Sequence, residues 1–363
     1  MDTVTQALLG MAVGQAVFGR RLRGQALLWG AVGGALPDLD TLVAAPFGSF
    51  ATLVHHRGIS HSLLFGPVVG SLLGYAFWRR RVRHPTRHSE RLIDWMGLWV
   101  LAIVTHPLLD LFTTYGTQLL APLSNHRFAV NGIGILDPIY TLLLLVAVVV
   151  GVVTLRRPFI GKWAAWAALG LTSCYLVYGV YLNHVAARLA RDQLRGENVH
   201  FEQIRAYPTV LQLWLRRVVA TSDREIRVGY VSMWAPGPIE WFVAPRRKHE
   251  RVSRLLQSKK GRIFAWFAQG MVAGRVEPGP QGVSVVEVDD IRYGLPPMAD
   301  RGFWGIRARY GPDGSLVGDV ERFRRPLPLS GMKAIRHLVN AARGYDPCTF
   351  RVGVTPGSPP VRC

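Results

Sequence analysis

The chain has 363 residues, of which 49% are hydrophobic and only 18% charged, and its formal net charge is +20. A chain of this length can bury a core without disulfides, and its three cysteines have no zinc-finger or Cys-x-x-Cys spacing. Collagen-like, disordered and disulfide-scaffold classes are therefore excluded. Because the apolar residues gather in long runs in the first half, the sequence predicts a membrane protein. Nucleic acid is not an expected partner, despite the positive net charge.

Six apolar runs approach the length of a membrane-spanning helix, which needs roughly 17 to 25 residues. The first run is short and contains glycine, so a tilted, re-entrant or interfacial helix is an alternative for it. It is not expected to be a cleavable signal, because Asp2 precedes it and arginines follow it. The sequence thus predicts a mainly α-helical membrane bundle of five or six spans, at Thr3–Phe18, Ala26–Phe47, Ser62–Trp78, Trp95–Phe112, Ile139–Leu155 and Trp163–Leu182.

The connections between these runs alternate in charge. Residues 20–23, 79–91 and 156–162 together carry twelve arginines and lysines, whereas 48–61 and 113–138 carry only Arg57 and Arg127. Cytoplasmic loops of membrane proteins are enriched in Lys and Arg. The basic connections are therefore expected on the cytoplasmic side of a bacterial inner membrane, and the other two on the periplasmic side.

No run of membrane length follows Leu182. Residues 1–182 are therefore expected to form the transmembrane domain, and residues 183–363 a soluble α+β domain on the periplasmic side. This second part carries 29 basic and 16 acidic residues, and the excess is expected to face anionic lipid headgroups. Cys348 and Cys363 are candidates for a disulfide there.

The second part shows both helical and strand-like patterns. Helices are predicted at His184–Leu194, Thr209–Ala220 and Glu250–Gln269. Strands are predicted at Ile226–Trp234, Ile239–Val243, Val283–Val288 and Phe303–Tyr310. The Gly-Pro-Asp-Gly sequence at residues 311–314 predicts a hairpin turn into a further strand at Ser315–Arg322.

Carboxylates and imidazoles recur near the outer ends of the predicted spans, where an ionisable side chain is costly unless it is paired or ligated. His106 and Asp110 are four residues apart, so both face one side of a helix and can reach one cation. Four separate segments deliver such residues to the same leaflet, which favours a shared site. The candidate metal ligands are Asp38, Asp40, His56, His61, His106, Asp110 and Asp137.

Nitrogen and oxygen ligands without thiolate suit Zn²⁺ first, with Mn²⁺ and Fe²⁺ as alternatives. Seven ligands are enough for one ion or two, and two ions could clamp both oxygens of a displaced phosphate. A metal-activated water and a carboxylate that accepts its proton would hydrolyse an ester. Asp40 and His61 are the candidate catalytic residues.

Each candidate also has a simpler interpretation. Asp38 and Asp137 stand beside prolines and suit helix caps. His106 could be a hydrogen-bonded core histidine, and Asp110 could form an ion pair with Arg57 or Arg127. Ser60 and Ser62 flank His61, but neighbours in sequence do not make a nucleophile–base pair in space.

Five short motifs resemble those of the inner-membrane metal-dependent hydrolases grouped with the YdjM-type LexA-binding membrane proteins. They are Met1–Thr5 (MDTVT), Pro37–Asp40 (PDLD), His56–Ser62 (HRGISHS), His106–Asp110 (HPLLD) and Leu136–Pro138 (LDP). The resemblance implies a bacterial inner-membrane protein whose metal site uses the seven candidate ligands, with Asp2 as an addition. Members commonly have histidine where this chain has Gln6, so the first segment departs from the pattern.

Three functions follow from these features. The first is a membrane-embedded hydrolase that acts on an ester or phosphoester of a lipid or lipid-linked molecule at the outer leaflet. The second is a non-enzymatic membrane module with a structural metal and a basic tail that binds lipid or a protein partner of unknown identity. The third is a transporter, which would need ionisable residues through the full membrane depth, whereas the inner leaflet here carries few.

Overall fold

The computed structural model describes residues 1–83, 90–246, 249–294, 301–325 and 332–344. The chain divides into two compact units. The first comprises Met1–Tyr181 and Val210–Gln212, and the second comprises Leu182–Thr209 and the chain from Leu213 onward. The predicted pairing of Cys348 with Cys363 lies outside the described residues.

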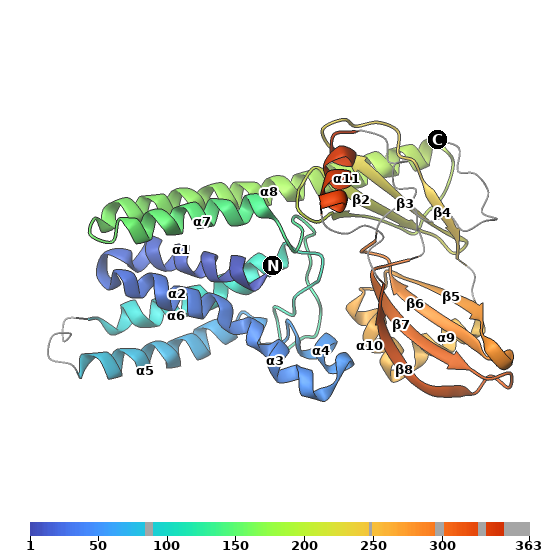
Figure 1. Ribbon diagram of the computed structural model, residues 1–363, viewed down its shortest axis with the longest axis horizontal. Helices are drawn as coiled ribbons and strands as arrows, with labels where there is room; N and C mark the ends of the chain where they lie inside the picture. The colour runs from blue at the N-terminus through green and yellow to red at the C-terminus, as the bar shows by residue number, and fades with distance from the viewer. Residues whose placement is uncertain (84–89, 247–248, 295–300, 326–331, 345–363) are drawn as a thin grey trace. The chain divides into compact units, whose positions relative to one another are not determined.

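The first unit is a bundle of helices that lie side by side (Figure 1). Its long helices are α1 (Thr3–Leu22), α2 (Gly24–Ala35), α5 (Ser71–Val82), α6 (Leu92–Leu111), α7 (Pro138–Val153) and α8 (Pro158–Gly196), the last of which contains the boundary between the units. Helix α1 packs against α2, α6 and α7, and α6 also packs against α2 and α5. Helix α6 is therefore central to the bundle.

Glycines allow α1 and α2 to approach closely. A Cβ atom on Gly10 would lie 2.1 Å from the carbonyl oxygen of Gly30, and one on Gly34 would lie 2.5 Å from the carbonyl oxygen of Gln6. Small residues let helix backbones pack at short distance in membrane proteins. This contact holds the end of α2 that carries Gly34 against the start of α1.

Gly10→Ala is expected to lower the apparent Tm of the detergent-purified protein. The added methyl group would meet backbone that cannot rotate away, and overpacking of this kind costs about 1–3 kcal/mol. Gly170→Ala is the matched control, because a Cβ atom on Gly170 of α8 would have no atom within 4 Å. The control is expected to keep or raise the Tm, since alanine favours helix by up to about 1 kcal/mol. Equal Tm values for the two variants would contradict the close contact.

The second predicted span is interrupted. Helix α2 ends at Ala35, and the chain continues through the 3₁₀ turn η1 (Leu36–Leu39), helix α3 (Asp40–Ala44) and a second 3₁₀ turn, η2 (Ala45–Phe47). Proline removes a backbone hydrogen-bond donor, and Pro37 stands at the break. Helix α4 (Ser49–His55) and the 3₁₀ turn η3 (Ile59–His61) follow. The break places Asp38 and Asp40 on a turn instead of a continuous helix.

Fewer helices qualify as membrane spans than the five or six predicted. In the described part of the chain, α6 and α8 are long and apolar enough to cross a membrane. A third span is counted if Ser49–His61 and Gly66–Val82, which meet at a 60° bend, are taken together. The segment Gly66–Val82 consists of a π-helical turn, η4 (Gly66–Gly70), and α5. Helix α7 is apolar but has only 16 residues, and α2 has 12.

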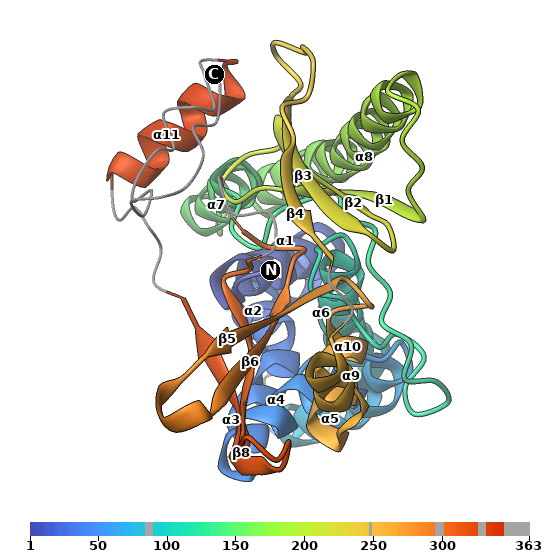
Figure 2. The same cartoon turned by 90° about the vertical axis from the view of Figure 1, so that its right-hand side faces the viewer.

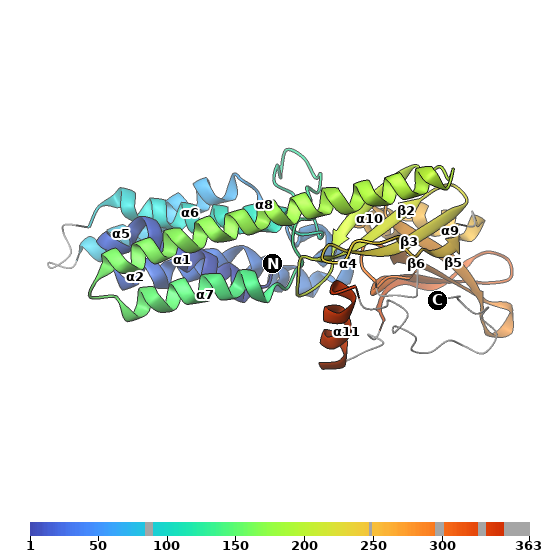
Figure 3. The ribbon, with the colours of Figure 1, turned by 90° about the horizontal axis from the view of Figure 1, so that it is seen from above.

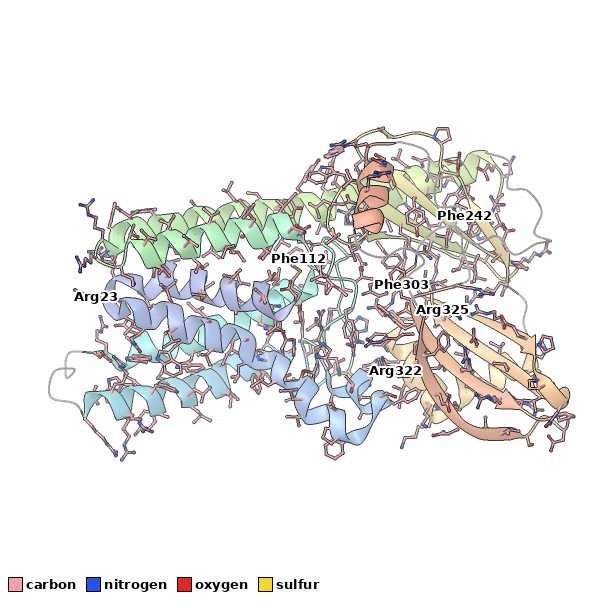
Figure 4. The ribbon with its side chains drawn as sticks, viewed as in Figure 1. Arg23, Phe112, Phe242, Phe303, Arg322 and Arg325 are labelled. Carbon is pink, nitrogen blue, oxygen red and sulfur yellow. The ribbon has the colours of Figure 1, made fainter. Side chains whose placement is uncertain are left out.

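The basic connections lie at one end of the bundle. Helices α1, α5 and α7 end at Leu22, Val82 and Val153, and these three ends lie together in Figures 1 and 3. Figure 4 shows Arg23 at this end and Phe112, which directly follows α6, toward the opposite end. The alternation of charge along the sequence thus corresponds to the two ends of the bundle.

The second unit contains two antiparallel four-stranded sheets in its described residues, each with its strands in chain order (Figure 2). The first sheet consists of β1 (Gln203–Pro208), β2 (Leu215–Thr221), β3 (Glu225–Ser232) and β4 (Phe242–Pro245). The second consists of β5 (Val272–Pro278), β6 (Ser284–Asp290), β7 (Trp304–Tyr310) and β8 (Leu316–Arg324). Helices α9 (Glu250–Gln257) and α10 (Lys259–Phe267) connect the sheets, and α11 (Met332–Ala342) follows β8. A helical first part followed by a part with both helices and strands is confirmed.

One helix prediction for this unit is wrong, and a second missed a break. Residues 209–220 contain strand β2 instead of a helix, and β2 lies between β1 and β3 with every residue buried. A strand buried on both faces lacks the alternation that marks a half-buried strand, so its apolar run resembles a helix. The predicted helix Glu250–Gln269 is divided at Ser258, whose side chain caps α10 by accepting from the Gly261 N–H. Strands β1 and β5 were not predicted.

The other elements of this unit lie near their predicted positions. Residues His184–Leu194 form the last part of α8, and β3, β6 and β7 overlap the predicted strands. The predicted hairpin joins β7 to β8, and the Gly311 N–H donates to the Ser315 carbonyl oxygen at 2.9 Å. The strand predicted at Ile239–Val243 is shifted to β4.

Some of the basic residues form ion pairs within the second sheet. Glu287 on β6 pairs with Arg275 of β5, Arg307 of β7 and Arg325. Burial alone would raise the pKa of Glu287, but hydrogen bonds from Arg307 and Arg275 outweigh it and hold the pKa at about 2. The Arg325 N–H also donates to the Phe303 carbonyl oxygen at 2.8 Å, and both residues are marked in Figure 4. These arginines stabilise the sheet as well as adding positive charge.

Candidate metal centre

Three of the seven predicted ligands come together in the first unit. Asp38 of η1, His61 of η3 and His106 of α6 each offer one ligand atom, and these atoms lie within 4.8 Å of one another. Asp38 Oδ1 is 3.7 Å from His61 Nε2 and 3.4 Å from His106 Nε2, and the two Nε2 atoms are 3.0 Å apart. The side chains of both histidines are fully buried, and that of Asp38 is 13% exposed.

These distances fit a divalent cation. An ion held tetrahedrally at about 2.0–2.1 Å from its ligand atoms separates those atoms by roughly 3.4 Å. The three distances of 3.0, 3.4 and 3.7 Å lie on both sides of that value. One carboxylate and two imidazoles are also an ordinary ligand set for such an ion.

Hydrogen bonds determine which nitrogen of each histidine faces the group. His106 Nδ1 is 2.6 Å from the carbonyl oxygen of Gly34, which can only accept, so Nδ1 carries the proton. His61 Nδ1 is 3.2 Å from Asp40 Oδ2, and this nitrogen is likewise the donor. In the neutral rings the two Nε2 lone pairs then face each other across 3.0 Å. Such an arrangement requires a shared proton or a metal ion between them.

Asp40 supports this group and is not part of it. Its Oδ1 is 2.8 Å from His56 Nδ1, while its Oδ2 accepts from the Arg57 backbone N–H at 3.0 Å and the Ser60 hydroxyl at 2.7 Å. With His61 as a further partner, the carboxylate binds four residues of the segment that follows α4. Both oxygens of Asp40 are thus engaged by this segment, and its role as a base stays a prediction. His56 likewise faces Asp40.

Ser60 contacts His61 but does not form a nucleophile–base pair with it. The Ser60 Oγ is 2.9 Å from His61 Nδ1, the same nitrogen that faces Asp40. A serine nucleophile needs a ring nitrogen that can accept its proton, with the carboxylate on the other nitrogen. Here the hydroxyl proton goes to Asp40 instead.

Asp110 lies beside the two histidines but is already neutralised. Its Oδ2 is 3.4 Å from His61 Nε2 and 3.6 Å from His106 Nε2. The same oxygen is 2.9 Å from Arg57 Nε, and the amino group of Met1 contacts the other oxygen. The ion pair with Arg57, one of the alternatives raised by the sequence, is therefore present.

Arg57, which the sequence offers only as an ion-pair partner of Asp110, makes several further contacts beside the site. Its side chain is buried, donates to the Thr113 hydroxyl at 2.6 Å, and lies over the Tyr115 ring at 4.7 Å. Its φ of 59° is unfavourable for a residue with a side chain and persists only where surrounding contacts enforce it. The available signal was that Arg57 and Arg127 are the only cations in the two outer connections.

Gln6 of α1 reaches the same group as a donor. Its amide nitrogen donates to Asp110 Oδ1 at 3.0 Å and to the His106 carbonyl oxygen at 3.2 Å. These two acceptors orient the amide, and its Oε1 is buried without a hydrogen-bond donor among the described residues. The first segment thus contributes an amide to the site where the resemblance would place an imidazole.

Asp137 and Asp2 lie at helix starts. Asp137 Oδ1 accepts from the backbone N–H groups of Ile139 and Tyr140 at 3.1 and 3.0 Å, so it caps α7. The Tyr175 hydroxyl donates to Asp137 Oδ2 at 3.0 Å. Asp2 caps α1 by accepting from the Thr5 N–H. The cap interpretation therefore describes Asp137, which lies outside the group formed by Asp38, His61 and His106.

Comparisons with known proteins cover the part of the chain that contains this group. The sequence model of the family described as YdjM inner membrane protein matches residues 1–186, just over half of the chain. The uncharacterized protein YfhP of Bacillus subtilis (strain 168) is 27% identical over 248 residues, which are 63% of this chain and 68% of that protein. No solved structure matches the chain significantly.

Proposed function

Because the chain belongs to the YdjM inner membrane protein family, we propose that it is a bacterial inner-membrane hydrolase whose metal ion is held by Asp38, His61 and His106. The observation that carries the proposal is the pair of Nε2 atoms that face each other at 3.0 Å beside the Asp38 carboxylate. Zn²⁺ is the first expectation for this ligand set, with Mn²⁺ and Fe²⁺ as alternatives. The ligand set of three supports one ion.

The arrangement favours catalysis over a purely structural role. Catalytic zinc sites have three protein ligands and keep a position open, whereas structural sites are closed by four. A bound divalent ion would supply polarisation of an ester or phosphoester oxygen and an activated water. The chain's own contribution is to hold the imidazoles through Asp40 and the Gly34 carbonyl, and to neutralise Asp110 through Arg57.

The proposed substrate is an ester or phosphoester of a lipid or lipid-linked molecule. Asp38 follows α2 and His106 lies near the end of α6, so both stand remote from the arginine-rich ends of these helices. The positive-inside rule supports a cytoplasmic position for the arginine-rich end, and hence a site at the outer leaflet near lipid phosphates. On the same argument α8 leads into a periplasmic second unit whose excess basic charge meets anionic headgroups.

Purified full-length protein is expected to hydrolyse at least one of three probes: bis(4-nitrophenyl) phosphate, 4-nitrophenyl butyrate and phosphatidylglycerol in nanodiscs. Turnover should disappear with a chelator and return when Zn²⁺ is added, because the ion supplies the activated water. His126→Ala is the matched control, since His126 is exposed, contacts Phe128 and is not part of the group. A protein that keeps one metal ion and hydrolyses none of the probes would favour the non-enzymatic membrane module.

A further inference from the structure

A cavity of about 700 Å³ lies beside the candidate metal centre, within the first unit. This volume is in the range of small-molecule sites, about 300–1,000 Å³. Apolar side chains dominate its walls, and the polar residues that line it are Asp40, His55 and Ser60. A polar ligand would lose its hydrogen bonds to water in such a cavity without replacing them, so the walls favour an apolar ligand.

One end of the cavity adjoins the metal centre. Two of its polar residues, Asp40 and Ser60, are the partners of His61 Nδ1, at 3.2 and 2.9 Å. Leu39, another lining residue, stands in the chain between Asp38 and Asp40. A ligand that fills the cavity therefore ends beside Asp40 and Ser60, the residues that contact His61 Nδ1.

The cavity extends from this end along the bundle. The cavity is lined by Phe65, which directly precedes η4, by Val69 of η4 and by Leu73 of α5. They are spaced four residues apart and so form a row along one face of this segment. Eight residues of helix correspond to about 12 Å. Helix α5 runs from the site toward Arg79 and Arg80, so the row leads from the proposed outer leaflet toward the middle of the membrane.

The cavity is open to the apolar surface of the bundle. Four lining side chains on its rim, Leu39, Val43, Phe47 and Ile59, are between 50% and 75% exposed. Contiguous exposed apolar residues mark a binding or membrane-contact surface. In a membrane-embedded bundle this rim contacts hydrocarbon, so a lipid tail can enter the cavity sideways.

We propose that the cavity binds one acyl chain of a membrane phospholipid and so holds the ester or phosphoester of that lipid on the side of the metal centre that carries Asp40 and Ser60. An acyl chain matches the apolar walls, the extended row of side chains and the opening toward hydrocarbon. The inference rests on the proposed function, because it names the substrate class of that hydrolase. The substrate would be a long-chain lipid instead of a soluble phosphoester. Binding itself requires neither metal nor turnover.

Neighbouring residues offer a matched pair of variants. Val69→Trp places an indole in the cavity, whereas Val68→Trp places it on η4 at a side chain that is 58% exposed and does not line the cavity. The probe is phosphatidylglycerol with a diazirine in one acyl chain, photolysed in nanodiscs and mapped by peptide mass spectrometry. Val69→Trp is expected to reduce labelling of residues 36–47 and 59–73 by about tenfold, equivalent to about 1.4 kcal/mol, while Val68→Trp labels like the wild type.

A second pair of variants tests whether the first result reflects the cavity or the misfolding of one variant. Leu73 lines the cavity one turn further on, whereas the neighbouring Leu72 is 65% exposed and does not line it. Leu73→Trp and Leu72→Trp should repeat the contrast, and unchanged metal content shows that a variant keeps the site. Equal labelling within both pairs would overturn the acyl-chain site and show that lipid contacts only the outer surface.

Hydrolysis assays separate this inference from the proposed function. If no probe is hydrolysed but the labelling contrast remains, the acyl-chain site stands and the hydrolase proposal fails. If Val69→Trp hydrolyses phosphatidylglycerol as fast as the wild type, the hydrolase stands and the acyl-chain site fails. With both correct, Val69→Trp loses activity on phosphatidylglycerol, whereas Val68→Trp keeps it.

Discussion

His106→Ala is expected to abolish stoichiometric metal binding by the purified protein. The substitution removes one of three ligand atoms and leaves His61 Nε2 and Asp38 Oδ1, which are 3.7 Å apart. Loss of an outer partner alone weakens metal binding about 10- to 100-fold, so loss of a direct ligand should exceed about 100-fold. Elemental analysis after dialysis, together with competition against a chromogenic chelator, measures both the content and the affinity.

Two further variants make this result specific. His126→Ala removes an exposed histidine outside the group and should keep the metal content of the wild type. Asp40→Asn keeps the size of the side chain but weakens the contact to His61 Nδ1, so affinity should fall only about 10- to 100-fold. If Asp40→Asn releases the ion as completely as His106→Ala, Asp40 is itself a ligand and the assignment of its supporting role is wrong. Equal metal content in His106→Ala and wild type would contradict the assignment of a metal centre to Asp38, His61 and His106.

Arg57→Met is expected to be among the most destabilising single substitutions in the chain. It leaves the fully buried Asp110 carboxylate without its closest side-chain cation and removes the donor to the Thr113 hydroxyl. Breaking a buried ion pair by removal of one partner costs about 3–5 kcal/mol. Arg57→Lys should cost less, because it keeps the positive charge near Asp110. Thermal unfolding in detergent, supported by the yield of monodisperse protein, measures the difference.

A surface ion pair provides the control for Arg57. Arg254 and Glu250 form an i, i+4 pair on α9 with side chains 52% and 74% exposed. Such pairs contribute about 0.3–0.5 kcal/mol. Arg254→Met should therefore leave the Tm almost unchanged. A comparable loss in both variants would show that arginine removal acts through solubility or detergent binding instead of the buried charge of Asp110.

The gathering of Asp38, His61 and His106 could be predicted from the sequence, but their selection from seven candidates could not. The sequence predicts a similar depth for all seven, because the motifs that carry them lie near the predicted outer ends of the spans. Whether a given side chain becomes a ligand depends on its hydrogen bonds. Asp40 accepts hydrogen bonds from the segment after α4, and Asp137 accepts them from the start of α7. The positions of those partners depend on the folded backbone, and the spacing of residues in the sequence does not predict them.

The helix and strand errors have a related origin. Apolar runs report burial or contact with lipid, but they do not report where a helix breaks. The break at Pro37 carries Asp38 into a turn, and the burial of β2 on both faces hides its strand character. In both places the surrounding packing outweighs the local pattern.

Composition, charge alternation and motif spacing are local properties, and they are sufficient for the membrane class and for the distinction between the two ends of the bundle. The identity of the ligand atoms, the pairing of Asp110 with Arg57 and the cavity along α5 arise from contacts between segments far apart in the chain. Such contacts depend on distances of a few tenths of an ångström and on the direction of lone pairs. The folded backbone sets both.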